Sequence, residues 1–478
     1  MEYANRPLVQ RLVEFKEADP VSFHVPGHKN GILSGLPNSL RIALSYDLTE
    51  LEGLDDLHQP EGAIEEAVQK LTDLYGSDKS FFLVNGSTVG NLAMVYATCR
   101  EGETVIVQRN AHKSIFNAIE LTGARPVFIA PEWDHNTRTA TAVTVEQVKS
   151  ALEVYPEAKA VILTYPTYYG IAGKELEEAI RFCHERQVPV LVDEAHGAHF
   201  VIGEPFPSSA LALGADVVVH SAHKTLPAMT MASFLHIRSN LISPEKVAHY
   251  LQMLQSSSPS YLLMASLDDA RAYAESYTEK DSISFLGKRN AFIKRLGGIQ
   301  YLQTIETDDA LKLIVRIEGY SGFDVQRAFD AVGIYVELAD PYQVLLVLPL
   351  LKKEQDYPFE SIAEKIELAV FRLLKLKKMN RMIEPPNFEY AISTPTYTVR
   401  ELEQLQAGWV PYEETIGMVA AASIIPYPPG IPLLLAGERV TESHIQSLTA
   451  LLTLGANFQG AIEVNNKQIF VVTNEVEE

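Results

Sequence analysis

The sequence predicts an α/β fold built around a mostly parallel β-sheet that is covered by helices on both faces. Two observations lead to this prediction. Short runs of Val, Ile and Leu recur between residues 61 and 235, as in TVIVQ (104–108) and DVVV (216–219). Segments with apolar residues at helical spacing lie between these runs, as in TVEQVKSALEVY (144–155). Continuous apolar strands that alternate with amphipathic helices are typical of parallel sheets buried between two helical layers.

The predicted elements follow one another along the chain. Residues 1–60 are rich in turn-forming residues and are expected to form an N-terminal segment. Residues 61–295 are expected to form the major domain, and a short helix is expected near SSALALGA (208–215). Strand and helix patterns predict a small α/β domain at 296–380. Residues 381–478 are expected to form a C-terminal α+β domain.

Composition and charge limit the classes of function. The 478 residues carry a formal charge of -21, so a nucleic-acid partner is not expected. Apolar runs such as QVLLVLPLL (343–351) are much shorter than the ~20 residues of a membrane-spanning helix, and no signal-peptide core precedes residue 20. The two cysteines, Cys99 and Cys183, fall on apolar faces of predicted helices and are expected to be buried thiols. A cytoplasmic protein without a membrane partner is predicted.

A glycine and two hydroxyl residues come before a predicted helix over 89–100. Gly86, Ser87 and Thr88 lie in the segment NGSTVGN. Backbone N–H groups, the helix dipole and two hydroxyl groups at such a position can bind a phosphate. Simple capping of the helix by a hydroxyl is the alternative. The glycine fingerprints of nucleotide-binding proteins are absent from the sequence.

Polar residues also follow two of the predicted strands. His112 follows TVIVQ and could stack on an aromatic ligand or form only local hydrogen bonds. Asp193 comes where the apolar run PVLV ends, and a carboxylate in that place needs a cationic partner. His196 and His199 have the spacing of some metal ligands, but Gly197 interrupts the helix that would fix this spacing. No metal site is expected.

Lys224 follows the strand DVVV within the segment HSAHK. It lies 31 residues after Asp193, about the ~30 residues of one strand–crossover–strand unit, so both side chains are expected at one sheet edge. Pyridoxal phosphate (PLP) needs a lysine for its aldehyde, a carboxylate for its ring nitrogen and a helix N-terminus for its phosphate. A flat side chain such as His112 suits its ring. The sequence therefore predicts PLP as the cofactor, with the pKa of the Lys224 amine lowered by His223 and the apolar strand. The alternative is a surface lysine.

The chain resembles the Orn/Lys/Arg decarboxylases, which are PLP-dependent enzymes of the aminotransferase-like fold (fold type I). The resemblance extends over about residues 20–460 and implies a major domain with a seven-stranded-type sheet. Long bacterial members carry an additional N-terminal wing domain, whereas only some twenty residues precede PGHK here, so the short form is expected. The segments that carry the resemblance are FHVPGHKNG, NGST, NAHKS, DEAHGAH, SAHKTLPA, SSSPSYLLMASLD and PYPPGIPLLLAGE.

This resemblance implies roles for individual residues. Lys224 would hold the cofactor as a Schiff base, Asp193 would pair with the ring nitrogen, and His112 would stack on the ring. His196 and His223 would line the pocket, and either would supply a proton to the carbanion. The active site of this fold usually forms between two subunits. The other implied contacts are to phosphate (Ser87, Thr88, Ser221 and, reaching the partner subunit's phosphate, Ser257 and Ser258) and to substrate (His24 and His28).

The predicted function is α-decarboxylation of a basic amino acid. Arginine, lysine or ornithine would give agmatine or a diamine for polyamine biosynthesis, with arginine slightly favoured because the short form suits a route to agmatine. A homodimer or a dimer of dimers is expected. The cationic end of the substrate needs an acid, for which Asp55, Asp56 and Glu438 are candidates, and a solvated surface carboxylate is the alternative for each.

Two other functions stay open. An aminotransferase or lyase would use the same cofactor, and an aminotransferase would clamp the substrate carboxylate with an arginine such as Arg316, Arg327 or Arg372. A non-catalytic PLP-binding protein would absorb light like a PLP enzyme but release no CO₂.

Overall fold

The computed structural model describes residues 3, 5–376, 391–427, 430–464 and 466–474. The chain divides into two compact units. The first consists of Met1–Thr98 with Cys183–Thr278, and the second of Cys99–Phe182 with Glu279–Glu478. The division into four consecutive domains stays a prediction, and its boundary between residues 380 and 381 lies outside the described residues.

Four strands of the first unit follow the order β1-β9-β8-β7. They are β1 (Lys79–Leu83), β7 (Val190–Asp193), β8 (Val217–His220) and β9 (Ser233–Ile237). β7 and β8 run parallel with Asp193 opposite Val219, and β9 runs antiparallel to both β8 and β1. Every residue of β8 is buried, as its continuous apolar run predicts. Because β7 and β8 are parallel neighbours, the segments that follow them leave the same edge.

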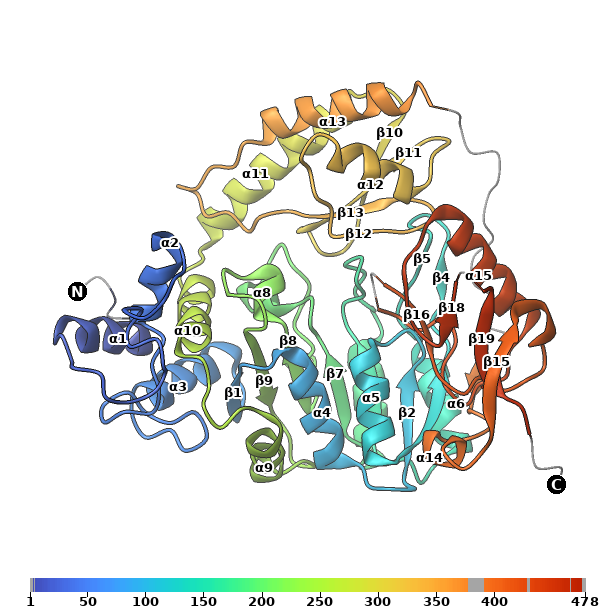
Figure 1. Cartoon of the computed structure of the whole chain (residues 1–478), viewed down its shortest axis with the longest axis horizontal. Helices are drawn as coiled ribbons and strands as arrows, with labels where there is room; N and C mark the ends of the chain where they lie inside the picture. Colours follow the sequence, from blue (N-terminus) through green and yellow to red (C-terminus); the bar gives the residue numbers. More distant parts are fainter. Residues whose placement is uncertain (1–2, 4, 377–390, 428–429, 465, 475–478) are drawn as a thin grey trace. The chain divides into compact units, whose positions relative to one another are not determined.

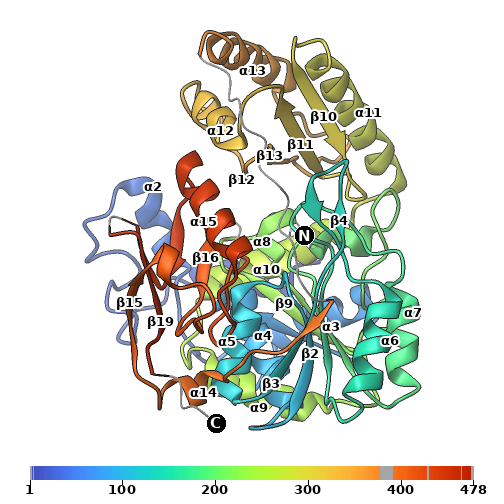
Figure 2. The same cartoon turned by 90° about the vertical axis from the view of Figure 1, so that its right-hand side faces the viewer.

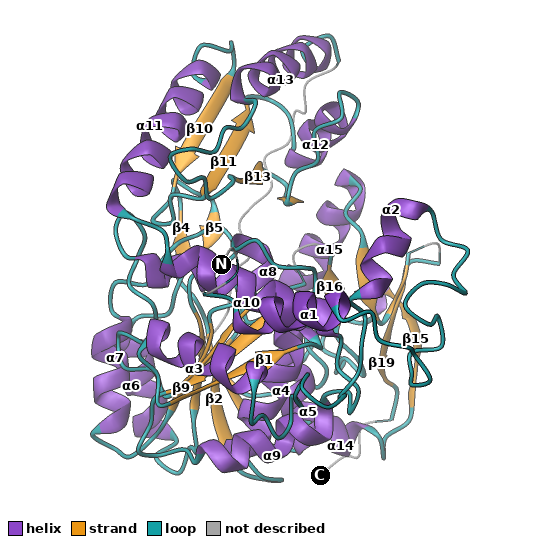
Figure 3. Ribbon diagram, turned by 90° about the vertical axis from the view of Figure 1, so that its left-hand side faces the viewer, coloured by secondary structure: helices purple, strands orange, loops and turns teal. Residues whose placement is uncertain are grey.

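Helices cover these strands (Figure 1). Helix α4 packs closely on β8, because a Cβ atom added to Gly90 would lie 2.9 Å from Val219 Cγ1 and 2.8 Å from Leu83 Cδ1. Figure 3 shows α1 beside α10, with which it is in contact. The helical segments of this unit are α1 (Pro7–Glu17), α2 (Asn38–Arg41), η1 (Ile42–Ser45), α3 (Ala63–Tyr75), α4 (Gly86–Thr98), η2 (Ala198–Ile202), α8 (Ala222–Thr225), α9 (Pro244–Leu254) and α10 (Tyr261–Glu275).

Two local predictions for this unit differ from the structure. Helix α4 begins at Gly86 and not at residue 89, so Ser87 and Thr88 belong to its first turn. The short helix expected over 208–215 is wrong, because Ala210–Gly214 form only turns. Gly214 adopts a φ of +103°, which no helix accommodates, and the chain turns there into β8.

The second unit has strands in the order β6-β2-β3-β14. β2 runs parallel to both β6 and β3, and β14 joins β3 antiparallel. A capping box of Thr144 and Gln147 begins helix α6 close to its predicted start. The elements of this part are β2 (Thr104–Gln108), α5 (Lys113–Thr122), β3 (Arg125–Ile129), β4 (Trp133–Asp134), β5 (Thr139–Ala140), α6 (Val145–Val154), β6 (Val161–Thr164), α7 (Leu176–His184) and β14 (Ile392–Ser393).

This unit also contains a four-stranded antiparallel sheet with three helices beside it (Figure 2). Its strands follow the order β10-β11-β13-β12. Along β11, Leu313 and Val315 pack in a core with the helices, whereas Ile314 packs with Tyr168 and Tyr169, as strand alternation requires. The elements are α11 (Glu279–Leu296), β10 (Leu302–Glu306), β11 (Lys312–Ile317), α12 (Gly322–Asp330), β12 (Leu338–Ala339), β13 (Val344–Val347) and α13 (Phe359–Leu373).

The C-terminal part of the unit has its own buried cluster, which includes Tyr412, Leu434, Leu448 and Val471. Its sheets have the orders β15-β19-β18 and β16-β17, and the described strand pairs are antiparallel. The elements are α14 (Val399–Leu402), β15 (Ala407–Pro411), η3 (Tyr412–Glu414), β16 (Ile424–Pro426), α15 (Glu442–Leu454), β17 (Phe458–Gly460), β18 (Ile462–Glu463) and β19 (Gln468–Val472).

Both cysteine thiols are buried, which confirms the prediction for Cys99 and Cys183. Burial, with the nearby Asp216 carboxylate, raises the pKa of the Cys183 thiol to about 12. Within the described ranges, no helix combines the length and the apolar character needed to cross a bilayer.

Candidate active site

The ends of β7 and β8 bring several predicted site residues together in the first unit. Asp193 is the last residue of β7, and Ser221 is the first after β8. The backbone N–H of Ser221 donates to the carbonyl of Ala195 at 3.3 Å, so the two segments stay side by side beyond the strands. Lys224 lies in the single turn α8 that follows.

Lys224 is half-buried and in contact with His196. Its Nζ lies 2.9 Å from His196 Nε2, the distance of a hydrogen bond from the amine to the imidazole. His196 is itself buried in the loop after β7. The lowered pKa expected for the Lys224 amine stays a prediction.

The Asp193 carboxylate is buried and oriented by two donors. Asn91 of helix α4 donates its Nδ2–H to Oδ2 at 2.9 Å, and the N–H of Ala195 donates to Oδ1 at 3.2 Å. A carboxylate has about four acceptor sites, so the side chain can take a further donor. Asn91 is fully buried.

The N-terminus of α4 carries the hydroxyl groups expected to bind phosphate. Ser221 Oγ donates to Ser87 Oγ at 2.8 Å, which joins the start of α4 to the end of β8. A Cβ atom added to Gly86 would meet no heavy atom within 4 Å, so there is room beside this helix end. Thr88 is exposed next to it. The first turn of α4 thus offers hydroxyl and N–H donors to an anion.

The remaining candidate residues of the first unit have local contacts. His223 is half-buried, and its Nδ1 lies 3.2 Å from the carbonyl oxygen of Ala232. Ser257 and Ser258 are exposed, and the Ser258 N–H donates to Ser256 Oγ at 3.2 Å. His199 is buried against the rings of Phe200 and Phe206, as a core histidine.

The N-terminal candidates are engaged by their own surroundings. His28 Nε2 lies 3.1 Å from Asp47 Oδ2, and its Nδ1 accepts from the N–H of Gly31 at 3.2 Å. His24 forms a hydrogen bond between its Nδ1 and the carbonyl oxygen of Val25. The binding of substrate by either histidine stays a prediction.

Asp55 caps helix α3. Its carboxylate accepts N–H donors from the chain around that helix start, and Asp56 in the same loop accepts from His58 N–H at 2.7 Å. Five bonds to Asp55 occupy a side chain with about four acceptor sites, so a substrate cation would have to displace them. The donors to Asp55 are the N–H groups of Asp56, Glu61, Gly62, Ile64 and Glu65.

In the second unit, His112 is the N-cap of helix α5. Its Nδ1 accepts from the N–H of Ser114 at 3.3 Å and lies 2.8 Å from Ser114 Oγ. The segment around Gly430 lies beside the ring, because a Cβ at Gly430 would be 3.3 Å from His112 Cδ2. Gly430 belongs to the motif PYPPGIP, of which Pro428 and Pro429 lie outside the described residues. Stacking of His112 on a cofactor ring stays a prediction.

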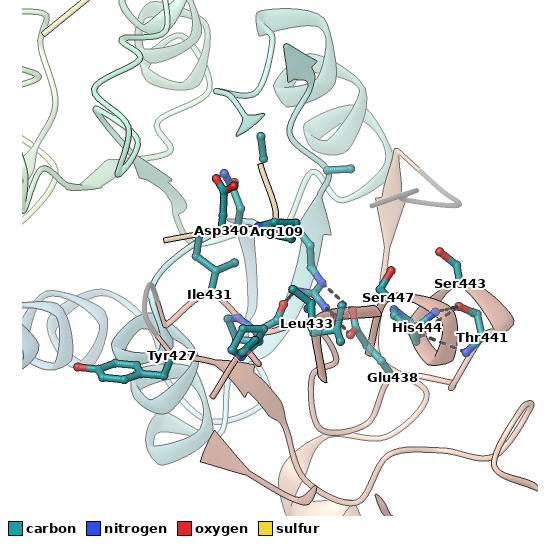
Figure 4. A pocket seen from close by; sticks show the side chains of 18 of the residues that line it. Arg109, Asp340, Tyr427, Ile431, Leu433, Glu438, Thr441, Ser443, His444 and Ser447 are labelled. Atoms are coloured by element: carbon teal, nitrogen blue, oxygen red, sulfur yellow. Dashed lines mark hydrogen bonds and ion pairs between the residues drawn. The ribbon is translucent and has the colours of Figure 1, made fainter. Parts of the chain in front are cut away.

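Glu438 forms a bidentate ion pair with Arg109 at the wall of a cavity of about 480 Å³ (Figure 4). Arg109 Nε donates to Oε1 at 2.8 Å and Nη2 to Oε2 at 2.6 Å, and the N–H of Leu435 adds a third bond at 2.8 Å. The guanidinium also donates to the carbonyls of Pro432 and Leu433. A substrate cation would therefore have to compete with Arg109 for Glu438.

The arginines considered for an aminotransferase are partly committed elsewhere. Arg316 donates to Gln343 and to two carbonyl groups, and Arg327 pairs with Asp324. Arg372 is exposed on helix α13. These contacts give no support to a carboxylate clamp.

Comparison with known proteins identifies the family. The model of the Orn/Lys/Arg decarboxylase major domain matches residues 6–307, more than half of the chain, and that of the Orn/Lys/Arg decarboxylase C-terminal domain matches residues 376–462. The chain belongs to the Orn/Lys/Arg decarboxylase family.

Relatives and solved structures agree with this family. The uncharacterized protein YaaO of Bacillus subtilis strain 168 is 44% identical over 98% of this chain and 99% of its own length. An arginine decarboxylase of Halalkalibacterium halodurans is 36% identical over 95% of both chains. The crystal structure of the Francisella novicida lysine decarboxylase LdcF has a TM-score of 0.79 at 18% identity, with 98% of this chain and 82% of that chain covered. This likeness confirms the predicted fold class, fold type I with a mostly parallel large sheet.

Orn/Lys/Arg decarboxylases and the structural neighbours of this fold are PLP-dependent enzymes. The described residues of the first unit fit this cofactor by their chemistry. A lysine amine, a buried carboxylate with remaining acceptor capacity, and a pair of hydroxyl groups at a roomy helix N-terminus are the groups that PLP needs.

Two residues that contact candidate residues were not predicted from the sequence. Asn91 had a local signal, since an amide lies four residues after Ser87 on the same helix face, among apolar neighbours. Arg109 had none, because its partner Glu438 lies 329 residues away.

Proposed function

We propose that this chain is a PLP-dependent α-decarboxylase of a basic amino acid, with arginine as the preferred substrate. Agmatine would then be the product, for polyamine biosynthesis in the cytoplasm. The observation that carries the proposal is the contact of Lys224 with the buried His196, next to the oriented carboxylate of Asp193. Membership of the Orn/Lys/Arg decarboxylase family supplies the reaction class.

The chain's own residues have distinct tasks in this reaction. PLP, when bound, supplies the electron sink that accepts the electron pair left by the departing CO₂. Asp193 keeps the ring nitrogen protonated, and Asn91 holds Asp193 in orientation through Oδ2. Lys224 provides the amine that holds the cofactor and later releases the product. The phosphate contacts fall to Ser87, Thr88 and Ser221.

A proton must reach the Cα atom after CO₂ leaves, and we propose His196 as its source. His196 is buried and 2.9 Å from the Lys224 amine, so the two groups can exchange a proton directly. His223 is the second candidate, and its Nδ1 faces the carbonyl of Ala232.

Sequence similarity supports arginine as the substrate. The arginine decarboxylase of Halalkalibacterium halodurans is 36% identical to this chain, whereas the lysine decarboxylase LdcA of Pseudomonas aeruginosa is 25% identical. The acid that binds the distal cation is not assigned to Asp55 or Glu438, because both carboxylates already have donors.

The test is an assay of CO₂ release from arginine, lysine and ornithine in parallel, with identification of the amine product. Faster turnover of arginine to agmatine is expected. Lys224→Ala should lose both the visible absorbance of the lysine-bound cofactor and the activity. A keto acid product without CO₂ would show an aminotransferase, and cofactor absorbance without any turnover would show a non-catalytic PLP-binding protein.

We also propose that the enzyme is a homodimer, or a dimer of dimers, in which a second copy covers the segment of residues 21–42. Large apolar side chains are exposed there, with Phe23 94% and Ile32 80% accessible. Such a cluster is typical of an interface and not of a monomer surface. Sedimentation analysis should give at least a dimer, and Phe23→Asp with Ile32→Asp should shift it toward monomer. A wild-type monomer would contradict the proposal. The other exposed members are Val21, Val25, Leu33, Leu36, Leu40 and Ile42.

A further inference from the structure

A buried hydrogen bond joins the two strand ends that carry the proposed PLP site. Glu194, the first residue after β7, accepts a hydrogen bond at Oε2 from His220 Nε2 at 2.9 Å. His220 is the last residue of β8, and both side chains have 0% exposure. Asp193 precedes Glu194 and Ser221 follows His220, so each member of the pair is the sequence neighbour of a predicted cofactor contact.

Local donors satisfy the Glu194 carboxylate. Besides His220, it accepts from Ser209 Oγ at 2.8 Å and from the N–H of Ala210 at 3.2 Å. Within the described part of the chain, Nδ1 of His220 has no hydrogen-bond partner. A neutral imidazole with its proton on Nε2 fits this environment, because a second ring proton would be buried without an acceptor.

Along the two neighbouring chain segments, Glu194 and His220 lie between two backbone contacts. Asp193 is opposite Val219 in the parallel ladder, and Ala195 accepts from the N–H of Ser221. Successive side chains of extended chain point to opposite faces. Accordingly, Asp193 contacts Asn91 of α4, whereas Glu194 contacts His220 and the segment at Ser209.

We propose that Glu194 and His220 are positioning residues, which fix the spacing between Asp193 and the segment of Lys224 from the opposite face of the strands. The inference rests on the proposed function, since it concerns how two groups are held for one cofactor. Without the bond, the backbone contact at Ser221 and the contact of Lys224 with His196 would have to hold the chain after β8 beside the loop after β7. Asp193 and Lys224 would then less often be spaced so that one PLP molecule could contact both, with its ring nitrogen at Asp193 and its aldehyde carbon at Lys224.

The adjacent strand offers a matched control. His236 of β9 also has 0% exposure, stacks on Tyr75 with ring centroids 4.1 Å apart, and has its Nδ1 2.8 Å from Ser80 Oγ. It has the same burial and the same aromatic neighbour as His220, whose ring centroid lies 5.2 Å from that of Tyr75 and 5.0 Å from that of His236 itself. His236 is opposite Val218 and makes no bond to Glu194 among the described contacts.

The experiment measures the affinity of each apoprotein for PLP, the visible absorbance after reconstitution, and the stability of the apoprotein in urea. His220→Asn is too short to reach Glu194, whereas His220→Gln can donate an amide N–H to it. We expect His220→Asn to weaken PLP binding by about tenfold or more and to shift the absorbance. His220→Gln should stay within about threefold of the wild type, and His236→Leu within about twofold despite a similar loss of stability.

Equal PLP affinities for the Asn and Gln variants, or an equal loss in His236→Leu, would overturn the positioning role and leave only a structural one. If His220→Asn does not fold, Glu194→Asp, which keeps the charge but shortens the reach, replaces it with the same expected loss. Failure of the proposed function gives a different result. The wild type would then bind no PLP, or the Lys224→Ala variant would retain the visible absorbance of the cofactor.

Discussion

Asp193 is a buried carboxylate and Asp340 a half-buried one, each at the end of a strand, and their hydrogen-bond donors differ. Asp193 follows the apolar run of β7 and accepts two hydrogen bonds, from Asn91 and Ala195. Asp340 follows β12 and accepts four, which use its acceptor sites. Asp340 is thus satisfied by its own loop and by Tyr169, whereas Asp193 retains capacity for a ligand. The number of donors, more than burial or position, separates a carboxylate available for chemistry from a structural one. The donors to Asp340 are Tyr169 Oη–H, the N–H groups of Tyr342 and Gln343, and Gln343 Nε2–H.

Replacing each carboxylate by alanine tests this contrast most strongly. Asp193→Ala should lower kcat by about 10³-fold or more, since the ring nitrogen of the cofactor loses its partner. Asp340→Ala should leave kcat within about threefold but lower the free energy of unfolding by about 2 kcal/mol at pH 7, because buried donors lose their acceptor. Steady-state kinetics measure kcat, and urea unfolding measures the stability, of both variants. A large loss of kcat in Asp340→Ala would remove the distinction.

The pH dependence of stability provides the next effect. Burial raises the pKa of Asp340 to about 6 from 3.8, although its hydrogen bonds oppose this. The native state therefore binds more protons than the unfolded chain between pH 4 and 6, and this group's contribution falls as the pH rises through that window. The difference amounts to about 3 kcal/mol. Urea unfolding at pH 4, 5, 6 and 7 should show Asp340→Ala losing less stability at the higher pH values, and a constant loss would contradict the shift.

Glu438 is a third carboxylate that can be compared, and its hydrogen-bond donors include the guanidinium of Arg109. Its pair with Arg109 is largely buried, with side-chain exposures of 14% and 7%. Glu438→Gln should lower the free energy of unfolding by about 2 kcal/mol and leave the KM for the amino acid unchanged. The matched variant Arg109→Lys should lose a similar amount, because lysine cannot make the bidentate contact. A rise in KM at constant kcat would instead place Glu438 at the substrate's cationic end.

The smallest effect is expected where a neighbour only orients the carboxylate. Asn91→Ala should lower kcat by about tenfold, because Asp193 loses the donor to Oδ2. Gln343→Ala, the corresponding change beside Asp340, should leave kcat unaffected and reduce stability alone. Both variants are compared at saturating PLP, so that a loss of affinity for the cofactor does not lower the measured kcat.

Much of this architecture can be predicted from the sequence. The apolar run of β8 and the apolar spacing of α6 determine local structure through short-range rules, and both elements were placed correctly. The helix expected over 208–215 was wrong, because Ala210–Gly214 form only turns although their apolar spacing is helical. Contacts such as Arg109 with Glu438 depend on tertiary structure and leave no pattern in the sequence.

The close approach of α4 to β8 at Gly90 has a consequence for how this enzyme can vary. One extra methyl group at that position would push the helix off the strand, and the helix carries both Ser87 and Asn91. A single small substitution would thereby displace the hydroxyl that we propose for phosphate binding and the amide that orients Asp193, although neither residue has changed. Position 90 should tolerate no other amino acid among variants screened for PLP binding, while its exposed neighbour Thr88 accepts some.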